Sequence, residues 1–286
     1  MSTVSPSADS WGEDDNARRY DAYTRIHPMY RDLSRDLISL AGLSADAAVV
    51  DLACGTGVTS REILAVLGHG GKLIGIDKSA AMLAVAAGSV ADLRASWIQA
   101  RAEHVDMYVP EPVDAVLTNS AIWQTHLAAT ASAVGNILAS GGRFVFNVGF
   151  DHLDRPDDPG FRADRPSLIS VMKVIAAEDY GWGPPDAAGA GSRPSRLSQE
   201  SICRYLDAAG FDIEQVAEFA YEQDADSERA WLSVPIFTKY QLPGLSYEDR
   251  MRVLAKACAR LGPRKAELSR WLAFAARVRE SAPQGD

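Results

Sequence analysis

The chain has 286 residues, of which 47% are hydrophobic and 23% charged, and its formal net charge is −9. Such a composition is typical of a globular protein, and the length allows one large α/β domain with an insertion or at most two domains. A protein that neutralises many phosphates needs a basic surface. The acidic balance and the absence of a Lys/Arg-rich run in the sequence therefore disfavour nucleic-acid partners.

No run of 18 apolar residues occurs, and the first residues have neither a charged nor an apolar leader pattern. We therefore predict a cytoplasmic protein with no membrane partner. The three cysteines are too widely spaced for a disulfide framework or a zinc site, and we predict no metal.

Residues 17–43 show helical periodicity, with apolar and aromatic side chains at steps of three and four. The pair His27-Pro28 interrupts the pattern, because proline removes a backbone donor and restricts the residue before it. We predict two helices joined at that point.

A β-branched, apolar run at residues 47–52 predicts a strand buried on both faces. Gly55 and Gly57 follow in a turn of small residues, and residues 58–67 predict a helix. Glycine suits a positive φ or a backbone that lies close to a ligand. Strand, glycine turn and helix start together expose backbone N–H groups and the positive end of a helix dipole, which predicts an anion site.

Residues 71–77 predict a second strand with Asp77 at its carboxyl end. Twenty residues separate Gly57 from Asp77, the span expected of an acid that accepts hydrogen bonds from ribose hydroxyls. A dinucleotide site would have a third glycine where Ser60 stands, and an apolar or glycine residue where Asp51 stands. A carboxylate at residue 51 suits a ligand with a positive amino group better than a pyrophosphate.

Residues 51–57 (Asp-Leu-Ala-Cys-Gly-Thr-Gly) and 75–79 (Gly-Ile-Asp-Lys-Ser) closely resemble the first two motifs of the class I S-adenosylmethionine-dependent methyltransferases. The resemblance covers residues 47–150 at motif level. It implies S-adenosyl-L-methionine as cofactor, contacted by Asp51, Ala53, Cys54, Gly55, Gly57, Asp77, Lys78, Met82, Ala102, Glu103 and Asn119.

Two positions depart from the resembled pattern. Arg101 stands where the family usually has the Asp that binds the adenine amino group, so that Glu103 either takes the acceptor role or is a surface charge. Lys78 stands where an apolar residue often stacks on adenine, and its stem either does the same or points into solvent.

The remaining pattern predicts an α/β fold: a doubly wound, mostly parallel seven-stranded sheet with helices on both faces and helical lid insertions. Five parallel strands and a sixth are read from the sequence, and in the resembled fold a final strand, expected at 271–278, inserts antiparallel beside strand six. Later elements are expected at residues 79–88 (helix), 97–100 (strand), 113–119 (strand), 128–138 (helix), 143–150 (strand), 198–210 (helix), 211–221 (strand) and 271–278 (strand).

We divide the chain into an N-terminal helical cover (1–46), the cofactor-binding core (47–150), an insertion (151–197) and the completion of the sheet (198–286). The last part holds a second insertion at about 222–267. Aromatic residues of the insertions are expected to form a lid. Peripheral packing or a dimer interface is the alternative, so a homodimer stays open.

Residues 119–124 follow strand four and are expected to face the transferred methyl group. They lack the Asn/Asp-Pro-Pro-aromatic motif of enzymes that methylate planar amine nitrogens, which argues against nucleic-acid bases. For the substrate we predict contacts from Trp123 and Gln124, and from Tyr20 and Tyr23 of the N-terminal cover.

The predicted function is in-line methyl transfer to an O, N or C nucleophile of a small molecule. A hydroxyl acceptor needs a general base, and the candidates are His27, His126 and His152, although a lone histidine is more often structural. The alternatives are a cofactor-binding or non-methylating protein on the same fold and, less favoured, an NAD(P) oxidoreductase.

Overall fold

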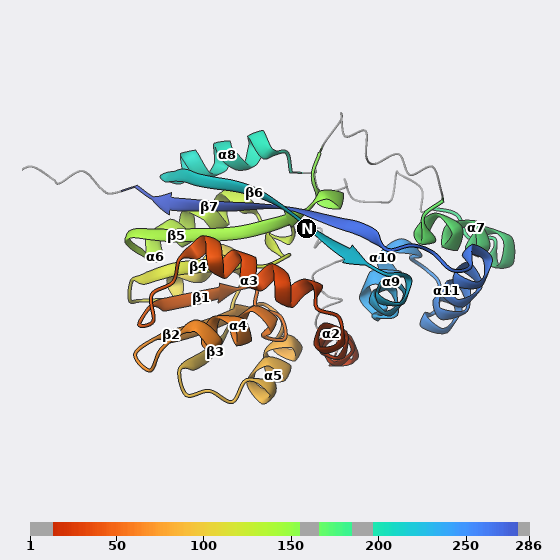
Figure 1. Ribbon diagram of the computed structural model, residues 1–286, viewed down its shortest axis with the longest axis horizontal. Coiled ribbons are helices and arrows are strands. Elements are labelled where there is room, and N and C mark those ends of the chain that lie inside the picture. Colours follow the sequence, from red (N-terminus) through yellow and green to blue (C-terminus); the bar gives the residue numbers. More distant parts are fainter. Residues whose placement is uncertain (1–13, 155–165, 185–196, 280–286) are drawn as a thin grey trace, which may run out of the picture.

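The computed structural model describes residues 14–154, 166–184 and 197–279 and has a seven-stranded sheet in the order β3-β2-β1-β4-β5-β7-β6 (Figure 1). Neighbouring strands run parallel except for β7, which is antiparallel to both β5 and β6. The predicted doubly wound, mostly parallel fold is confirmed. The strands are β1 (Ala48–Leu52), β2 (Lys72–Asp77), β3 (Ala95–Gln99), β4 (Val113–Thr118), β5 (Leu138–Gly149), β6 (Phe211–Gln223) and β7 (Glu267–Val278).

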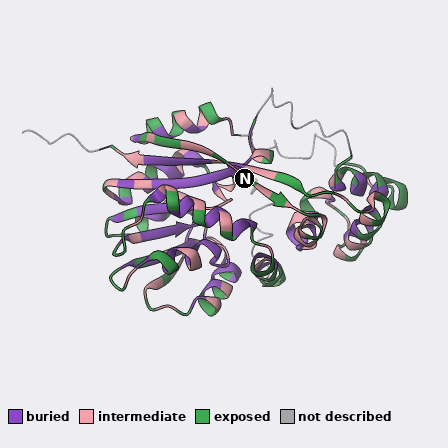
Figure 2. Ribbon diagram, in the orientation of Figure 1, coloured by how far each residue is buried: buried purple, intermediate pink, exposed green. Residues whose placement is uncertain are grey.

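Helices cover both faces of the sheet (Figure 1). On one face, α3 (Met29–Ala41) and α4 (Val58–Val66) pack on the strands through a buried cluster that includes Leu37 and Ile63. On the other, α6 (Leu127–Ile137) and α8 (Gln199–Ala208) pack around a cluster that includes Phe144. The central strands are accordingly buried along most of their length (Figure 2), as expected for β-branched runs between two helical layers.

Four further helices form a separate group beside the end of the sheet (Figure 1). Three of them share an apolar cluster that includes Met172, Leu232 and Val253, and Leu242 joins this cluster just after the fourth helix. Residues 267–270 of β7 pair only with β6, so a two-stranded ribbon runs past β5 to reach this group. The helices are α7 (Leu168–Tyr180), α9 (Ala225–Leu232), α10 (Pro235–Gln241) and α11 (Tyr247–Leu261).

An aromatic junction joins the sheet, the N-terminal helices and the helical group. Tyr23 of α2 (Asp14–Ile26), Tyr30 of α3, Ile236 of α10 and Trp271 of β7 are buried against one another in it. Helix α5 (Ala80–Ser89) begins at Ser79, whose hydroxyl accepts the Met82 N–H at 3.2 Å, as its sequence predicts.

Two boundaries differ from the sequence-based expectation. The helix was expected to run to residue 138 and the next strand to begin at 143, but Leu138 already pairs with Val113, and Gly141 and Gly142 lie within a register shift of β5. Strand β7 begins at Glu267 rather than Trp271, because its first residues pair with the extended end of β6. Residues 1–13, and residues 155–165 and 185–196 of the insertion expected at 151–197, lie outside the described residues.

In the part of the chain that the structure describes, no helix has both the length and the apolar character needed to cross a bilayer.

The close packing of β2 against β3 depends on the absence of a side chain at Gly75. A Cβ at this position would lie 2.4 Å from two ring carbons of Trp97 on the neighbouring strand. We expect Gly75→Ala to lower the free energy of unfolding by about 1–3 kcal/mol, since overpacking forces the ring or the backbone to move. Urea denaturation measures the change.

Gly88→Ala is the matched control. Gly88 lies on the exposed side of α5 with nothing within 4 Å of an added Cβ, so alanine should leave stability equal or raise it by up to about 1 kcal/mol. Identical unfolding midpoints for the two variants would show that Trp97 yields without cost.

Candidate active site

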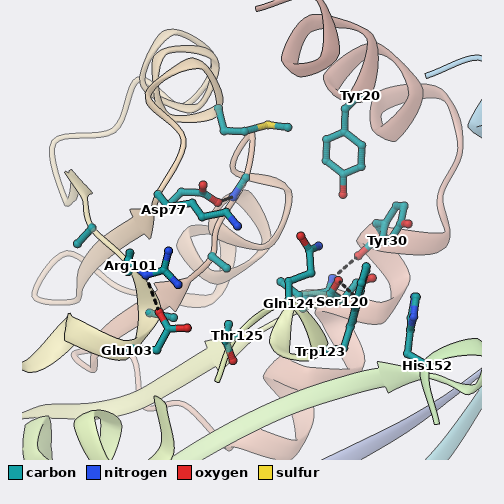
Figure 3. Close-up of a pocket in the computed structure, with 18 of the residues that line it drawn as sticks. Tyr20, Tyr30, Asp77, Arg101, Glu103, Ser120, Trp123, Gln124, Thr125 and His152 are labelled. Carbon is teal, nitrogen blue, oxygen red and sulfur yellow. Dashed lines mark hydrogen bonds and ion pairs between the residues drawn. The ribbon is translucent and has the colours of Figure 1, made fainter. Parts of the chain in front are cut away.

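A cavity lies at the carboxyl ends of β1, β2 and β4 and encloses about 1010 Å³, its open mouth included. This is the edge of an open parallel sheet at which ligands bind. Side chains from α2, α3 and α10 cover it, and Figure 3 shows residues that line it. Its lining comprises Tyr20, Tyr30, Ala53, Gly55, Asp77, Lys78, Met82, Ala100, Arg101, Ala102, Glu103, Asn119, Ser120, Ala121, Trp123, Gln124, Thr125, His152, Phe237 and Trp271.

The loop between β1 and α4 bends through alternating left-handed residues. Ala53, Gly55 and Gly57 have φ values of 57°, 55° and 80°. Ala53 adopts this conformation although it carries a Cβ, and such strain concentrates at functional sites. The bend turns the chain from the end of β1 into α4 and presents Ala53 and Gly55 to the cavity.

Asp77 ties this loop to the next strand. Its Oδ2 accepts the Gly55 N–H at 2.9 Å, and its Oδ1 accepts the Ser79 N–H at 2.8 Å. Burial raises the pKa of the Asp77 carboxyl above its usual value, although these N–H groups oppose the shift. Each oxygen retains a second lone pair, so the carboxylate can still accept hydrogen bonds from a ligand in the cavity.

Asp51 lies behind the loop rather than in the cavity. Its side chain points into the protein, where Oδ2 accepts the Ser60 hydroxyl of α4 at 2.5 Å and only 1% of the residue is exposed. Burial raises the pKa of Asp51 to about 7, against the Ser60 hydrogen bond, which lowers it. Here the carboxyl group anchors the first turn of α4.

Cys54 and Gly57, also expected at the cofactor, lie outside the lining. Cys54 is buried, which raises the pKa of its thiol. A Cβ at Gly57 would lie 3.2 Å from the Val90 side chain, so this glycine allows α4 to start close to the end of α5.

At the ends of β2 and β3, the cavity is lined by charged and small groups. Glu103, in the 3-10 helix η1 (Ala102–Met107), accepts the His126 N–H at 2.9 Å and lies 3.3 Å from Arg101 Nε. Burial opposes ionisation, yet the His126 N–H and Arg101 hold the pKa of Glu103 below its usual value. Lys78, Met82 and Ala102 line the same end. Arg101 is thus paired with the carboxylate that follows it.

The side-chain amides of Asn147 and Asn119 fix the position of the end of β4. Asn147 is fully buried; its Oδ1 accepts the Ser120 N–H at 2.6 Å, and its Nδ2 donates to Asn119 Oδ1 at 3.0 Å. Asn119 in turn donates to the Tyr30 carbonyl and to Ser34 Oγ, each at 3.0 Å. The network joins β4, β5 and α3 and fixes the backbone at Ser120, where φ is 58°.

Aromatic side chains line the cavity beside the residues that follow β4 (Figure 3). Trp123 and Gln124 lie in the short 3-10 helix η2 (Ile122–Gln124), and the Trp123 ring stacks on His152 with centroids 3.8 Å apart and planes at 9°. Tyr20 enters from α2, and burial raises the pKa of its hydroxyl well above the usual value.

Sequence reasoning missed Tyr30, Phe237 and Trp271, all of which line the cavity; Ser120, also in the lining, falls in the range 119–124 expected there but was not singled out. Tyr30 belonged to the periodic stripe of its helix and Phe237 to an aromatic-rich insertion, so both had a weak signal. Trp271 had none, because its place depends on how β7 pairs.

Besides Asp51, Cys54 and Gly57, three further predicted residues do not line the cavity. Tyr23 and His27 stack at 4.8 Å and line a separate surface hollow between α2, α9 and α11. His126 precedes α6, and its Nδ1 accepts the Ala129 N–H at 3.3 Å as a helix cap. Among the three candidate bases, His152 is the one in the cavity lining. Within the described residues, no group of three or more His, Cys, Asp or Glu side chains is arranged to hold a metal ion.

The core of the chain is similar in sequence to known methyltransferases. Residues 49–142 match a family model described as a methyltransferase domain. The probable S-adenosylmethionine-dependent methyltransferase CRG1 of Saccharomyces cerevisiae is 34% identical over 128 residues, which make up 43% of this chain and 43% of the yeast protein. The matched region therefore spans less than half the length of that relative.

Solved structures extend the fold similarity over nearly the whole chain. A proposed methyltransferase from Bacillus halodurans has a TM-score of 0.55 at 15% identity, and the match covers 86% of this chain and 99% of that one. The [4+2]-cyclase SpnF has a TM-score of 0.52 at 16% identity, with 88% and 81% covered. At these identities the likeness concerns the fold alone.

The buried Asp51 carboxyl should make the free energy of unfolding depend on pH. Its folded-state pKa of about 7 lies above the ordinary value, so between the two values the folded protein binds more protons than the unfolded chain. The free energy of unfolding should therefore fall as pH rises towards 7. Asp51→Asn keeps an acceptor for Ser60 but does not ionise, and should remove this fall.

Urea denaturation of both proteins at about pH 5 and about pH 8 measures the effect, with a relative shift on the order of 2–4 kcal/mol in favour of the variant at the higher pH. Parallel pH profiles would contradict the buried, protonated carboxyl.

Proposed function

We propose that this chain is a class I S-adenosylmethionine-dependent methyltransferase that methylates an O, N or C nucleophile of a small molecule. The observation that carries the proposal is the pairing of Asp77 with the bent loop at Gly55, 2.9 Å from Oδ2 to the amide nitrogen. A carboxylate at the end of the second strand, next to the glycine-rich loop that follows the first, is the arrangement that accepts hydrogen bonds from ribose hydroxyls.

The residues present fit the cofactor. The open loop at Ala53 and Gly55 leaves backbone in the cavity wall for the amino-acid part, and Asp77 faces the place of the sugar. Lys78 and Met82 flank the place of the adenine, and Ala102 offers backbone there. Glu103 and Arg101 neutralise one another at that end, so Glu103 remains an ionised acceptor.

When bound, S-adenosylmethionine supplies a methyl group on a positively charged sulfur, which becomes a neutral thioether when the methyl group leaves. The protein must orient the acceptor and keep the site dry, since alignment accounts for most of the acceleration of such a displacement. Tyr20, Tyr30 and Phe237 line the cavity and would shield a bound acceptor from water. For a hydroxyl acceptor, His152 is the proposed base that takes the proton.

The substrate is proposed to be a small molecule rather than a nucleic acid or a membrane lipid. Helices α2, α3 and α10 place side chains over the cavity, so a large polymer has no continuous groove to follow. The net charge of −9 would also repel a polyphosphate backbone.

A non-methylating enzyme is the second candidate, because the [4+2]-cyclase SpnF shares the fold. Incubation with tritiated-methyl S-adenosylmethionine and extracted metabolites separates the two. Transfer of label to a small organic product supports methylation; cofactor binding without any transfer supports the second candidate.

Asp77→Ala should weaken S-adenosylmethionine binding at least about tenfold, because hydrogen bonds to a charged group are each worth about 1.5–3 kcal/mol. Isothermal titration calorimetry measures the affinity.

Asp114→Ala is the matched control, since Asp114 Oδ2 also accepts a backbone N–H, that of Ala48 at 2.8 Å, but at the opposite end of the sheet. Equal affinities for the two variants would count against the assigned role of Asp77.

His152→Gln should slow label transfer to a hydroxyl acceptor by about 10²-fold, the usual contribution of a general base. His126→Gln should retain the wild-type rate, because glutamine preserves an acceptor for the helix cap. Initial rates of label incorporation compare the two. An unchanged rate in His152→Gln would remove this residue from the chemistry.

A further inference from the structure

The two ends of the cavity differ in charge. The four lining residues with a carboxyl, ammonium or guanidinium group, Asp77, Lys78, Arg101 and Glu103, all lie at the carboxyl ends of β2 and β3. Figure 3 shows Asp77, Arg101 and Glu103 on one side and Tyr20, Tyr30, Trp123 and His152 on the other. If the proposed function holds, the charged end takes the cofactor and the aromatic end takes the methyl acceptor.

The aromatic end is built from flat surfaces. Trp123 and His152 stack with their planes at 9°, while Tyr30 meets Trp271 at 69° with ring centroids 6.3 Å apart. The Phe237 ring meets Tyr20 edge-on at 6.3 Å. Rings at steep angles leave flat faces and edges towards the space between them, which favours a planar apolar molecule.

The hydroxyl groups of Tyr30 and Ser120 provide a hydrogen-bond donor at the aromatic end of the cavity. Trp231 donates its single indole N–H to the Tyr30 hydroxyl at 3.2 Å, and an indole nitrogen cannot accept in return. The Tyr30 hydroxyl also hydrogen-bonds with the Ser120 side chain (Figure 3). That bond uses one of the two hydroxyl protons, whichever residue donates it. One proton of the pair remains for the cavity.

Of the two residues, both of which line the cavity, Ser120 is the more exposed. Tyr30 is 94% buried (6% exposed), whereas Ser120 is half-buried at the strand end and lines the cavity. Its backbone is held at both sides, by Asn147 Oδ1 on its N–H and by Trp123 Nε1 on its carbonyl at 3.2 Å. The positive φ of 58° is a strained conformation for serine, which the surrounding bonds maintain.

We propose that the acceptor is a planar, largely apolar molecule with an oxygen that accepts a hydrogen bond from Ser120, at or beside the atom that is methylated. A carboxylate acceptor lacks a guanidinium or ammonium partner among the residues that line this end. An ammonium acceptor would bring its own donors and would face the Ser120 proton without a carboxylate nearby. An aryl alcohol or aryl ketone meets both the flat walls and the donor.

Calorimetry with S-adenosylhomocysteine comes first, followed by titration of its complex with 2-naphthol, 2-methoxynaphthalene and naphthalene. The proteins are wild type, Ser120→Ala and Ser120→Gly; glycine removes the hydroxyl and suits the positive φ. We expect both variants to bind the two oxygen-bearing probes about tenfold more weakly, the loss of roughly one buried hydrogen bond, and naphthalene with unchanged affinity. Tyr30→Phe leaves the Ser120 hydroxyl in place and should cost less.

Loss of affinity for all three probes alike, or for none, would overturn the role of Ser120. If the wild-type complex binds S-adenosylhomocysteine but none of these probes, the substrate class is wrong while the methyltransferase assignment stands. Tighter binding of 1-naphthylmethylammonium than of 2-naphthol would identify an aromatic cage for cations instead. Failure of S-adenosylhomocysteine itself to bind would overturn the proposed function and this inference together.

Discussion

The hydrogen bonds of the Asp77 carboxylate hold the charged end of the cavity together. One oxygen accepts from the loop that follows β1 and the other from the turn that starts α5, so a single side chain fixes the relative position of two strand ends. Because the group is half-buried, its ionisation depends on these donors and on any cation or hydroxyl that enters the cavity. The same atoms thus serve the architecture and face the ligand.

A second constraint acts at the other end of the cavity. The Asn147 amide has no exposure to solvent, and both its oxygen and its nitrogen are used on residues 119 and 120. A buried amide that left either group unpaired would cost about 1–3 kcal/mol, so the pair determines where β4 ends. Asn119 donates to the Tyr30 carbonyl and so links this network to α3. The position of the covering helix therefore depends on the sheet beneath it.

These two constraints divide the cavity into a charged end and an aromatic end. The division follows from topology: β2 and β3 lie on one side of β1, whereas β4, β5 and β7 lie on the other. The ribbon of β6 and β7 carries the helical group past the sheet, and α10 of that group returns Phe237 to the aromatic end. A planar acceptor bound there would lie beside the residues that follow β4, next to the cofactor end.

The sequence by itself determined the local elements and their order. The glycine turn after β1, the acid at the end of β2 and the cap at Ser79 depend on residues close together in the chain, so pattern and spacing are sufficient. Only the tertiary structure decided which way Asp51 points and that Tyr30, Ser120 and Trp271 meet in one cavity. Residues 30, 120 and 271 lie on different elements, and a period or a spacing carries no information about contacts formed by strand pairing and helix docking.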